Sequence, residues 1–151
     1  MRTEGLDYDA HKVGAVHRTL ARTVSETDIV SFVNLCGFVE PLFIDMEYVK
    51  RESVFTRRAA PGALTFARAE GLIMQTGLIH GTGMAWLGGE LRIVAPVLEG
   101  DTIRVEVEVV DKRETKKPDR GIVTYRHEVT NQRGEVVLEA TVKRMIKRKS
   151  A

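Results

Sequence analysis

One carboxylate stands out in a stretch that is otherwise almost entirely apolar. Residues 61–78 read P-G-A-L-T-F-A-R-A-E-G-L-I-M-Q-T-G-L, and only Arg68, Glu70 and Gln75 interrupt the apolar pattern. Side chains on a helix advance by roughly 100° per residue, so Glu70 points away from the other two polar residues and toward apolar neighbours. Because an unpaired buried charge is unfavourable, we expect this carboxylate to be either paired with a cation or functional.

The stretch around Glu70 has the composition of a long helix. Pro61 and Gly62 precede it, Gly77 ends it, and the roughly four turns between them consist mostly of residues that suit a helix. A helix that is apolar almost all the way round is normally surrounded by other structure. We therefore predict a central, mostly buried helix over about residues 61–78.

The residues before this helix predict one strand and one capped helix. Residues 17–24 have the composition of a first strand, and Ser25 with Asp28 has the spacing of a capping box. The capped helix ends at Gly37. Its apolar side includes Cys36, which we expect to find in the core.

The segment between the two helices has a different character. In the stretch F-V-E-P-L-F-I-D (38–45), Pro41 argues against a regular helix and predicts a loop or an overhanging segment. Residues 46–53 then have the composition of a short helical piece.

After Gly77 the apolar period changes from helical to two, which is typical of strands. Gly88 and Gly89 interrupt the first strand and predict a bulge or bend. The predicted strands cover residues 84–94, 102–111, 122–130 and 135–147, with a charged hairpin loop at 112–121; Ile103, Val105, Val107 and Val109 share one face of the second strand. We expect an α+β fold in which an antiparallel sheet curls around the central helix.

The composition indicates a globular protein and excludes several function classes. At 151 residues, 43% of them hydrophobic and 29% charged, the chain is expected to form one domain over 1–151. No apolar run approaches the roughly 18–20 residues of a membrane span, and the N-terminus lacks the pattern of a signal peptide. A single cysteine excludes an internal disulfide and is typical of a reducing cytoplasm, where we place the protein.

The net charge of +2 is unevenly distributed, because residues 143–149 read K-R-M-I-K-R-K. No nucleic-acid-binding motif accompanies this tail, and basic residues on a terminal strand usually form a solvated face, so we expect no nucleic-acid partner. Contact with nucleotide phosphates is a second alternative for the tail. His11, His17 and His127 lack the spacing of metal ligands, and we expect no metal site.

Three segments resemble the MaoC-like branch of the hot-dog superfamily. They are T-V-S-E-T-D-I near the start and, as the most specific parts, A-P-V-L-E-G-D-T-I-R-V-E-V-E-V-V and V-T-N-Q-R-G-E-V-V. The resemblance runs from about residue 12 to 146. It implies a hot-dog fold, in which a curved antiparallel sheet wraps a long central helix and two such sheets form a dimer. It also implies that acyl thioesters of coenzyme A or acyl carrier protein bind at the subunit interface; many members are (R)-specific enoyl-CoA hydratases or hydroxyacyl dehydratases.

The sequence departs from the family pattern at the catalytic positions. The family segment reads approximately G-D-x-N-P-L-H-x-D, in which Asp and His transfer protons, whereas this chain reads G-F-V-E-P-L-F-I-D. Phe38 replaces the Asp and Phe43 replaces the His, and phenylalanine neither accepts nor donates a proton. Glu40 takes the Asn position and is a candidate replacement for the lost carboxylate, although a loop glutamate is more often solvated. Asp45 matches a family acid that supports the loop.

Glu70 is the leading catalytic candidate in place of the missing pair. Some hot-dog thioesterases carry Asp or Glu on the central helix, eight residues after the first glycine of H-G-G, and Glu70 lies eight residues after Gly62. Such a carboxylate can act as nucleophile or general base toward a thioester, while the Gly62 amide at the helix N-terminus polarises the carbonyl. The alternative is a structural ion pair of Glu70 with Arg57, Arg58 or Arg92 at the dimer interface.

The same region supplies candidate substrate-binding residues. Phe38 and Phe43 are suited to an apolar wall for an acyl group. Pro61, which stands in place of the histidine of the usual A-H-G, and Phe66 belong to the start of the central helix. Two cationic candidates for binding nucleotide phosphates complete the set, Arg57 and Arg58.

The residues leave three functions open. The first is a hydratase/dehydratase-type hydro-lyase with a non-standard site. The second is an acyl-CoA thioesterase that uses Glu70, and the third is a non-catalytic acyl-thioester-binding protein or partner subunit. Beyond the coenzyme A or carrier-protein thioester itself we expect no cofactor. The expected assembly is a homodimer or higher oligomer, or a heteromer with a catalytically intact paralogue.

Overall fold

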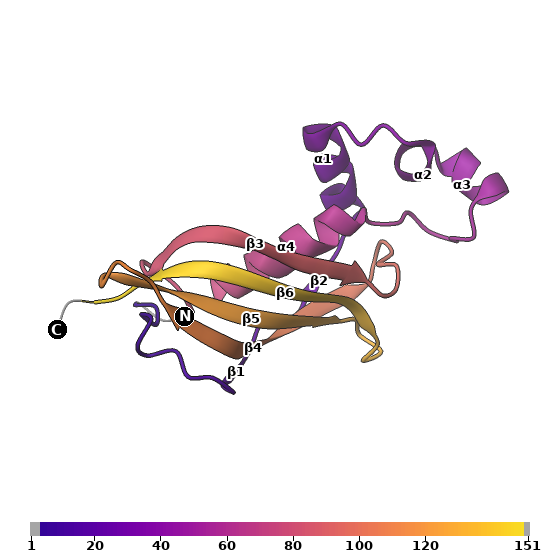
Figure 1. The fold of residues 1–151 in the computed structure, drawn as a ribbon. Helices are drawn as coiled ribbons and strands as arrows, with labels where there is room; N and C mark the ends of the chain where they lie inside the picture. The colour runs from indigo at the N-terminus through magenta and orange to yellow at the C-terminus, as the bar shows by residue number, and fades with distance from the viewer. Residues whose placement is uncertain (1–3, 150–151) are drawn as a thin grey trace.

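A curved antiparallel sheet forms the body of the molecule (Figure 1). The structure is a computed structural model that describes residues 4–149. The strands lie in the order β1-β4-β5-β6-β3, with β2 also paired to β4. Their bounds are β1 Val16–Arg18, β2 Arg22–Thr23, β3 Gly83–Ile93, β4 Thr102–Glu114, β5 Arg120–Thr130 and β6 Val136–Lys147. The short β1 and the long β3 are therefore the two edges of the main sheet.

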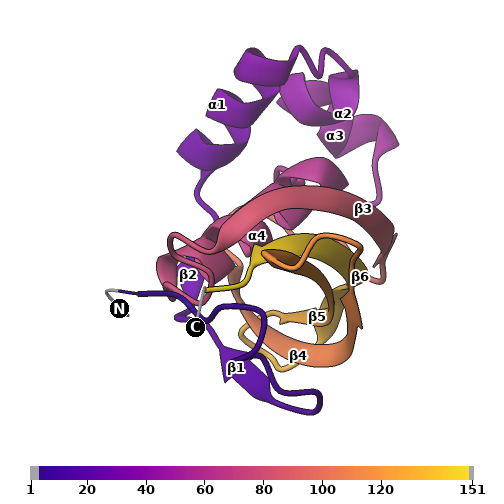
Figure 2. The ribbon, with the colours of Figure 1, turned by 60° about the vertical axis from the view of Figure 1, so that its left-hand side comes forward.

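The helix α4 (Gly62–Gln75) lies in the hollow of this sheet, as Figure 2 shows from the end of the strands. The inward side chains of the strands are those predicted from the period of two, since Ile103, Val105, Val107 and Val109 are all buried. They pack against the buried face of α4, which consists of Leu64, Thr65, Ala69, Leu72 and Ile73. The α+β fold with a central helix is confirmed. None of the helices within residues 4–149 is long and apolar enough to cross a membrane.

The helix α1 (Glu26–Cys36) begins at the capping box expected from the sequence. The Ser25 hydroxyl accepts a hydrogen bond from the Asp28 amide, and the Asp28 carboxylate accepts one from the Ser25 amide. Ile29 and Val33 are buried against the body, but the prediction that Cys36 lies in the core is wrong, because this residue is exposed. Leu35 is exposed as well, so the C-terminal end of α1 presents Cys36 to solvent although Val33 one turn earlier is buried.

An overhang, defined here as residues 38–55, projects from the body (Figure 1). It contains two short helices, α2 (Pro41–Ile44) and α3 (Met46–Glu52). The expectation that Pro41 excludes a helix is wrong, because Pro41 occupies the first position of α2, where the missing amide hydrogen is not needed. Asp45 has the supporting role expected from the resemblance. Its Oδ1 accepts hydrogen bonds from the first amides of α3.

Other element boundaries differ from the sequence prediction. The strand expected at 17–24 is divided into β1 and β2, and β4 and β5 extend into the loop expected at 112–121. The central helix ends at Gln75, because Thr76 caps it and Gly77 adopts a left-handed conformation with φ of 74°. The predicted bulge in β3 is present, since the pairing with β6 shifts register between Trp86 and Gly88.

Asp101 connects the loop before β4 to two other segments, the turn that contains Gln132 and Arg133 and the segment that contains Arg57. Its carboxylate is 2% exposed and accepts hydrogen bonds from the Leu98 amide and the Gln132 side chain. Burial opposes ionisation, but these hydrogen bonds and the nearby Arg57 and Arg133 outweigh it, and the pKa of Asp101 is lowered. The carboxylate therefore stabilises the fold in its charged form.

We predict that Asp101→Asn lowers the free energy of unfolding by about 1–3 kcal/mol at pH 7, because it leaves buried donors without a charged acceptor. A group whose folded pKa is lowered stabilises above its unfolded pKa and loses that effect as the pH falls. Urea denaturation at pH 7 and pH 3 checks this, with Glu106→Gln in an exposed ion pair as control. If the difference in unfolding free energy between Asp101→Asn and the unaltered protein is as large at pH 3 as at pH 7, the electrostatic explanation is contradicted.

Candidate active site

Glu70 forms an ion pair inside the fold. It projects from the middle of α4, and its Oε2 accepts a hydrogen bond from Nη2 of Arg144 on β6. The two side chains are only 19% and 9% exposed. The expected partners bind elsewhere, because Arg57 pairs with Asp101, Arg58 with Glu26 and Arg92 with Glu139. Glu70 is therefore paired, as one of the two alternatives expected, but the three predicted partners are wrong, because the cation is Arg144 of the same chain.

His127 completes a buried cluster with this ion pair. It lies on β5, its side chain is 1% exposed, and its Nδ1 is 3.4 Å from Oε1 of Glu70. Burial, reinforced by the positive charge of Arg144, lowers the pKa of His127 to about 4. At neutral pH the cluster therefore contains one cation, one carboxylate and one neutral imidazole.

Three atoms of this cluster are buried without a hydrogen-bond partner in the described part of the chain. They are Oε1 of Glu70 and both ring nitrogens of His127. Buried polar atoms are nearly always hydrogen-bonded, so such a concentration is typical of a site that binds water or a substrate. While Oε2 of Glu70 binds Arg144, Oε1 is an acceptor without a hydrogen-bond partner beside a neutral imidazole, which is an arrangement that can move a proton.

A separate apolar pocket of about 360 Å³ lies at the N-terminal end of α4. Its lining includes Phe43 and Phe55 of the overhang, Gly62 of α4 and residues 93–97. None of the lining side chains, all within residues 4–149, is ionisable. The amides of Leu64 and Thr65 donate to the Pro61 carbonyl, whereas those at the first two positions of a helix have no acceptor inside it, and Pro61 supplies no side-chain cap. The pocket can therefore accommodate an apolar chain and offers amide hydrogens to a carbonyl oxygen.

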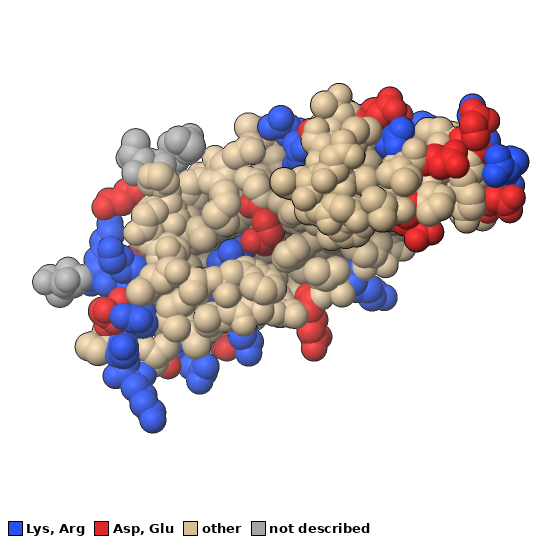
Figure 3. Space-filling view, turned by 90° about the horizontal axis from the view of Figure 1, so that it is seen from above, with Lys and Arg blue, Asp and Glu red and all other residues tan. Residues whose placement is uncertain are grey.

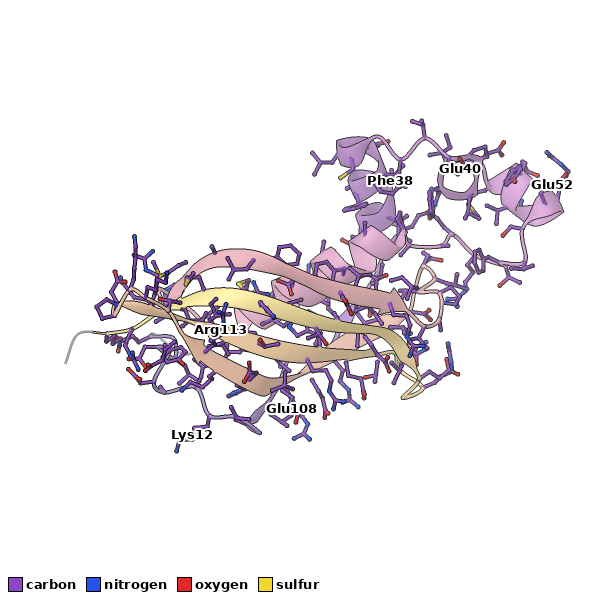
Figure 4. The ribbon with its side chains drawn as sticks, in the orientation of Figure 1. Lys12, Phe38, Glu40, Glu52, Glu108 and Arg113 are labelled. Atoms are coloured by element: carbon purple, nitrogen blue, oxygen red, sulfur yellow. The ribbon has the colours of Figure 1, made fainter. Side chains whose placement is uncertain are left out.

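The residues at the family's catalytic positions form an aromatic cluster. Phe38 lies 5.5 Å from Phe32 and 6.1 Å from Phe43 between ring centroids. Figure 4 places Phe38 and Glu40 away from the sheet, on the part of the chain that contains α1 to α3. Glu40 is exposed, and its side chain makes no capping hydrogen bond to α2. Phe43 lines the pocket, whereas Glu40 does not.

The remaining candidates occupy different surroundings. Phe66 packs edge to face against Trp86 of β3, with ring centroids 6.3 Å apart. Pro61 is buried and does not line the pocket. Arg57 and Arg58, expected to contact phosphates, bind backbone carbonyls of Glu99 and Phe43 respectively. Within residues 4–149 there is no group of three or more residues that could hold a metal ion.

Gly62 and Glu70 do not meet in one chain. They are eight residues apart on α4, which at about 1.5 Å per residue separates them by about 12 Å along the helix axis.

Sequence reasoning missed Arg144 and His127, although one signal was present. Both occupy inward positions of their strands, since Val142 and Ile146 on either side of Arg144, and Tyr125 and Val129 on either side of His127, are buried.

The chain belongs to the family described as MaoC like domain, whose model matches residues 10–131. It is 32% identical over 128 residues to an (R)-specific enoyl-CoA hydratase of Rhodospirillum rubrum, covering 85% of this chain and 83% of the relative. The hydratase resemblance inferred from the three segments is therefore confirmed at the level of the family.

Solved structures agree with the hot-dog assignment. A monoamine oxidase regulatory protein from Archaeoglobus fulgius superposes with a TM-score of 0.90 at 34% identity, over 99% of both chains. A Mycobacterium tuberculosis protein described as a double hotdog fold superposes with a TM-score of 0.87 at 22% identity, over 99% of this chain and 46% of that one. The second likeness concerns the fold alone, and it confirms the predicted hot-dog architecture.

We predict that Arg144→Met lowers the free energy of unfolding by about 3–5 kcal/mol, because it leaves the Glu70 carboxylate buried without its cation. The double variant Glu70→Gln/Arg144→Met should recover most of this loss. Chemical denaturation of the four proteins in a double-mutant cycle measures the coupling. As a control, Arg92→Met breaks an exposed pair and should change stability by less than about 1 kcal/mol. Additive effects of the two substitutions would contradict the coupling.

We predict that His127 stays neutral down to about pH 4, because burial and Arg144 disfavour its charged form. Its contribution to stability is present above the unfolded pKa of 6.5 and is lost as the pH falls toward 4. The loss amounts to about 3 kcal/mol. NMR titration of its imidazole carbons, with the urea-unfolded chain as reference, measures the folded pKa. A midpoint near pH 6.5 would show that the imidazole is not desolvated.

Proposed function

We propose that this protein acts on acyl thioesters as a hydratase/dehydratase-type hydro-lyase with a non-standard site, in which Glu70 takes the proton-transfer role of the missing Asp/His pair. The observation that supports this role is the free Oε1 of Glu70, which is buried beside neutral His127 while Oε2 binds Arg144. The relationship to an (R)-specific enoyl-CoA hydratase supports the reaction class.

The chemistry requires one group to exchange a proton with water and with the substrate. In hydration, the water oxygen bonds to Cβ of the 2-enoyl thioester as one water proton passes to Glu70, and the electron pair of the Cα–Cβ double bond moves toward Cα and the thioester carbonyl. Glu70 then gives the same proton to Cα. The net change is the gain of one water, and Glu70 returns to its starting protonation state. Negative charge that develops on the thioester oxygen is stabilised by amide hydrogens at the start of α4, next to Gly62.

A composite site requires two copies of the chain, because Gly62 and Glu70 are about 12 Å apart along one helix. A twofold axis with antiparallel α4 helices brings Gly62 of one copy toward Glu70 of the other. The surface supports such pairing. Figure 3 looks onto the side that carries β3 and α1 to α3, and most of this surface is uncharged. The edge strand β3 exposes several large apolar residues, Met84, Trp86, Leu87, Leu91 and Ile93.

A second candidate function is binding without catalysis, as a partner subunit or carrier of acyl thioesters. The observation that favours it is the chemical character of the pocket, in which Phe43 stands at the family's histidine position and no lining residue is ionisable. A thioesterase reaction at Glu70 remains a third outcome, because a carboxylate near a thioester carbonyl can also attack it or activate water.

We predict that Glu70→Gln lowers the hydration rate of a 2-enoyl-CoA by about 10²–10⁴-fold, the usual contribution of a general acid–base group. Purified protein is incubated with saturated, 2-enoyl and (R)-3-hydroxyacyl-CoA thioesters, and products are identified by mass spectrometry. Glu139→Gln, in an exposed ion pair, is the matched control and should leave the rate unchanged.

The products separate the three functions. Gain or loss of one water with the thioester intact supports the hydro-lyase, and release of free coenzyme A that disappears in Glu70→Gln supports the thioesterase. Binding without turnover supports the non-catalytic protein. A hydration rate that survives in folded Glu70→Gln would remove Glu70 from the mechanism.

A further inference from the structure

Arg58 joins the body, the helix α1 and the overhang. Its side chain is 12% exposed and lies between the body and the overhang. Nη1 donates a hydrogen bond to the carbonyl of Phe43 at 2.6 Å, and Nη2 donates one to the Glu26 carboxylate of α1 at 3.2 Å. Hydrogen bonds from a guanidinium are stronger than those between neutral groups, particularly where solvent is excluded.

The backbone of Arg58 is fixed to the body. Its carbonyl accepts a hydrogen bond from the Glu99 amide at 2.8 Å, and Ala59 next to it forms a bridge with Leu98. These contacts belong to the loop that the buried carboxylate of Asp101 organises. Arg58 therefore reaches from a rigid part of the fold toward the overhang, whereas the side chain of neighbouring Arg57 bonds back to the same loop, at the carbonyl of Glu99.

The first turn of α1 is held independently of Arg58. Asp28 accepts a hydrogen bond from Arg68 of α4 at 2.8 Å, and Ile29 and Val33 are buried. Within residues 4–149, the overhang has no comparable ion pair with the body. Its contacts with the rest of the molecule include the ring of Phe38 against Phe32 of α1, the packing of Phe43 against the core, and the hydrogen bond from Arg58 to the Phe43 carbonyl.

The overhang contributes Phe43 and Phe55 to the lining of the apolar pocket, and the body contributes Gly62 and Ile93, so the space in the pocket depends on where the overhang lies. We propose that Arg58 is a positioning residue for this pocket: it fixes the overhang through the Phe43 carbonyl and thereby sets the length of acyl chain that the pocket accepts. The second half of this statement rests on the proposed function, in which the pocket holds the acyl group. The first half concerns the free protein alone.

Hydrogen exchange in the absence of any acyl thioester tests the first half. In Arg58→Gln, the amides of residues 38–55 should exchange at least tenfold faster, while those of β4 to β6 keep their rates. Arg18→Gln is the matched control, since Arg18 also pairs with a carboxylate but lies on β1, outside the pocket and the overhang. Equal exchange of residues 38–55 in the variant and the unaltered protein would overturn the proposal.

Binding of saturated acyl-CoA thioesters of 4 to about 12 carbons, measured by calorimetry, tests the second half. Each methylene buried in the pocket adds about fourfold to affinity. Arg58→Gln should lower the ratio of affinities between the longest and shortest bound chains at least tenfold. A residue that only stabilised the fold would reduce binding of all chains equally, so an unchanged ratio would also overturn the proposal.

A second variant covers the case in which Arg58→Gln does not fold. Glu26→Gln removes the exposed partner of Arg58 and keeps the bond to Phe43, so exchange of the overhang should rise two- to threefold; an unchanged rate would count against the proposal.

If no acyl-CoA binds the unaltered protein, the proposed function fails and the acyl role of Arg58 fails with it. Hydrogen exchange still decides whether Arg58 holds the overhang.

Discussion

The packing of α4 into the curved sheet is the constraint on which the rest of the structure depends. The apolar face of α4 and the inward residues of β4, β5 and β6 form one continuous core. Burying these side chains stabilises the fold in proportion to the apolar area removed from water. This helix also positions the two candidate sites, because the pocket lies at its N-terminus and the charged cluster lies at its middle.

The ion pair between Glu70 and Arg144 lies at positions that apolar residues of similar size could also fill. Glu70 and Arg144 are each mostly buried, and such a pair contributes little net stability compared with hydrophobic residues of the same size. His127 beside them is held neutral by burial and by the positive charge of Arg144. This combination is poor as a stabilising device, and it makes a proton-accepting oxygen available next to an imidazole.

In contrast to the core, the overhang buries little surface and is connected to the rest of the chain by a few specific contacts. Pro41 starts α2 and Asp45 caps α3, so that local rules form its helices without help from the body. Its position relative to α4 depends on long-range contacts, which are the packing of Phe38 and Phe43 and the hydrogen bond from Arg58. The wall of the pocket thus depends on contacts between distant parts of the sequence.

The sequence by itself determined the features that depend on local pattern. The capping box of α1, the alternation in β4 and the bulge at Gly88 were all readable, because each depends on near neighbours or on fixed periods. The pattern also identified Glu70 as a residue in need of a partner. Its partner was not readable from spacing, since Arg144 is 74 residues away and reaches Glu70 only when β6 curls around α4.

Only the tertiary structure decided how the candidate residues are grouped. Phe43 and Gly62 line one pocket, and Glu40 is exposed on the overhang. Arg57 and Arg58, expected to contact phosphates, bind backbone carbonyls. The tertiary structure also exposed Cys36 at the C-terminal end of α1. The physical reason is common to all of these: a side chain's partners are set by which elements the curved sheet brings together, and a sequence period fixes only the face on which the side chain lies.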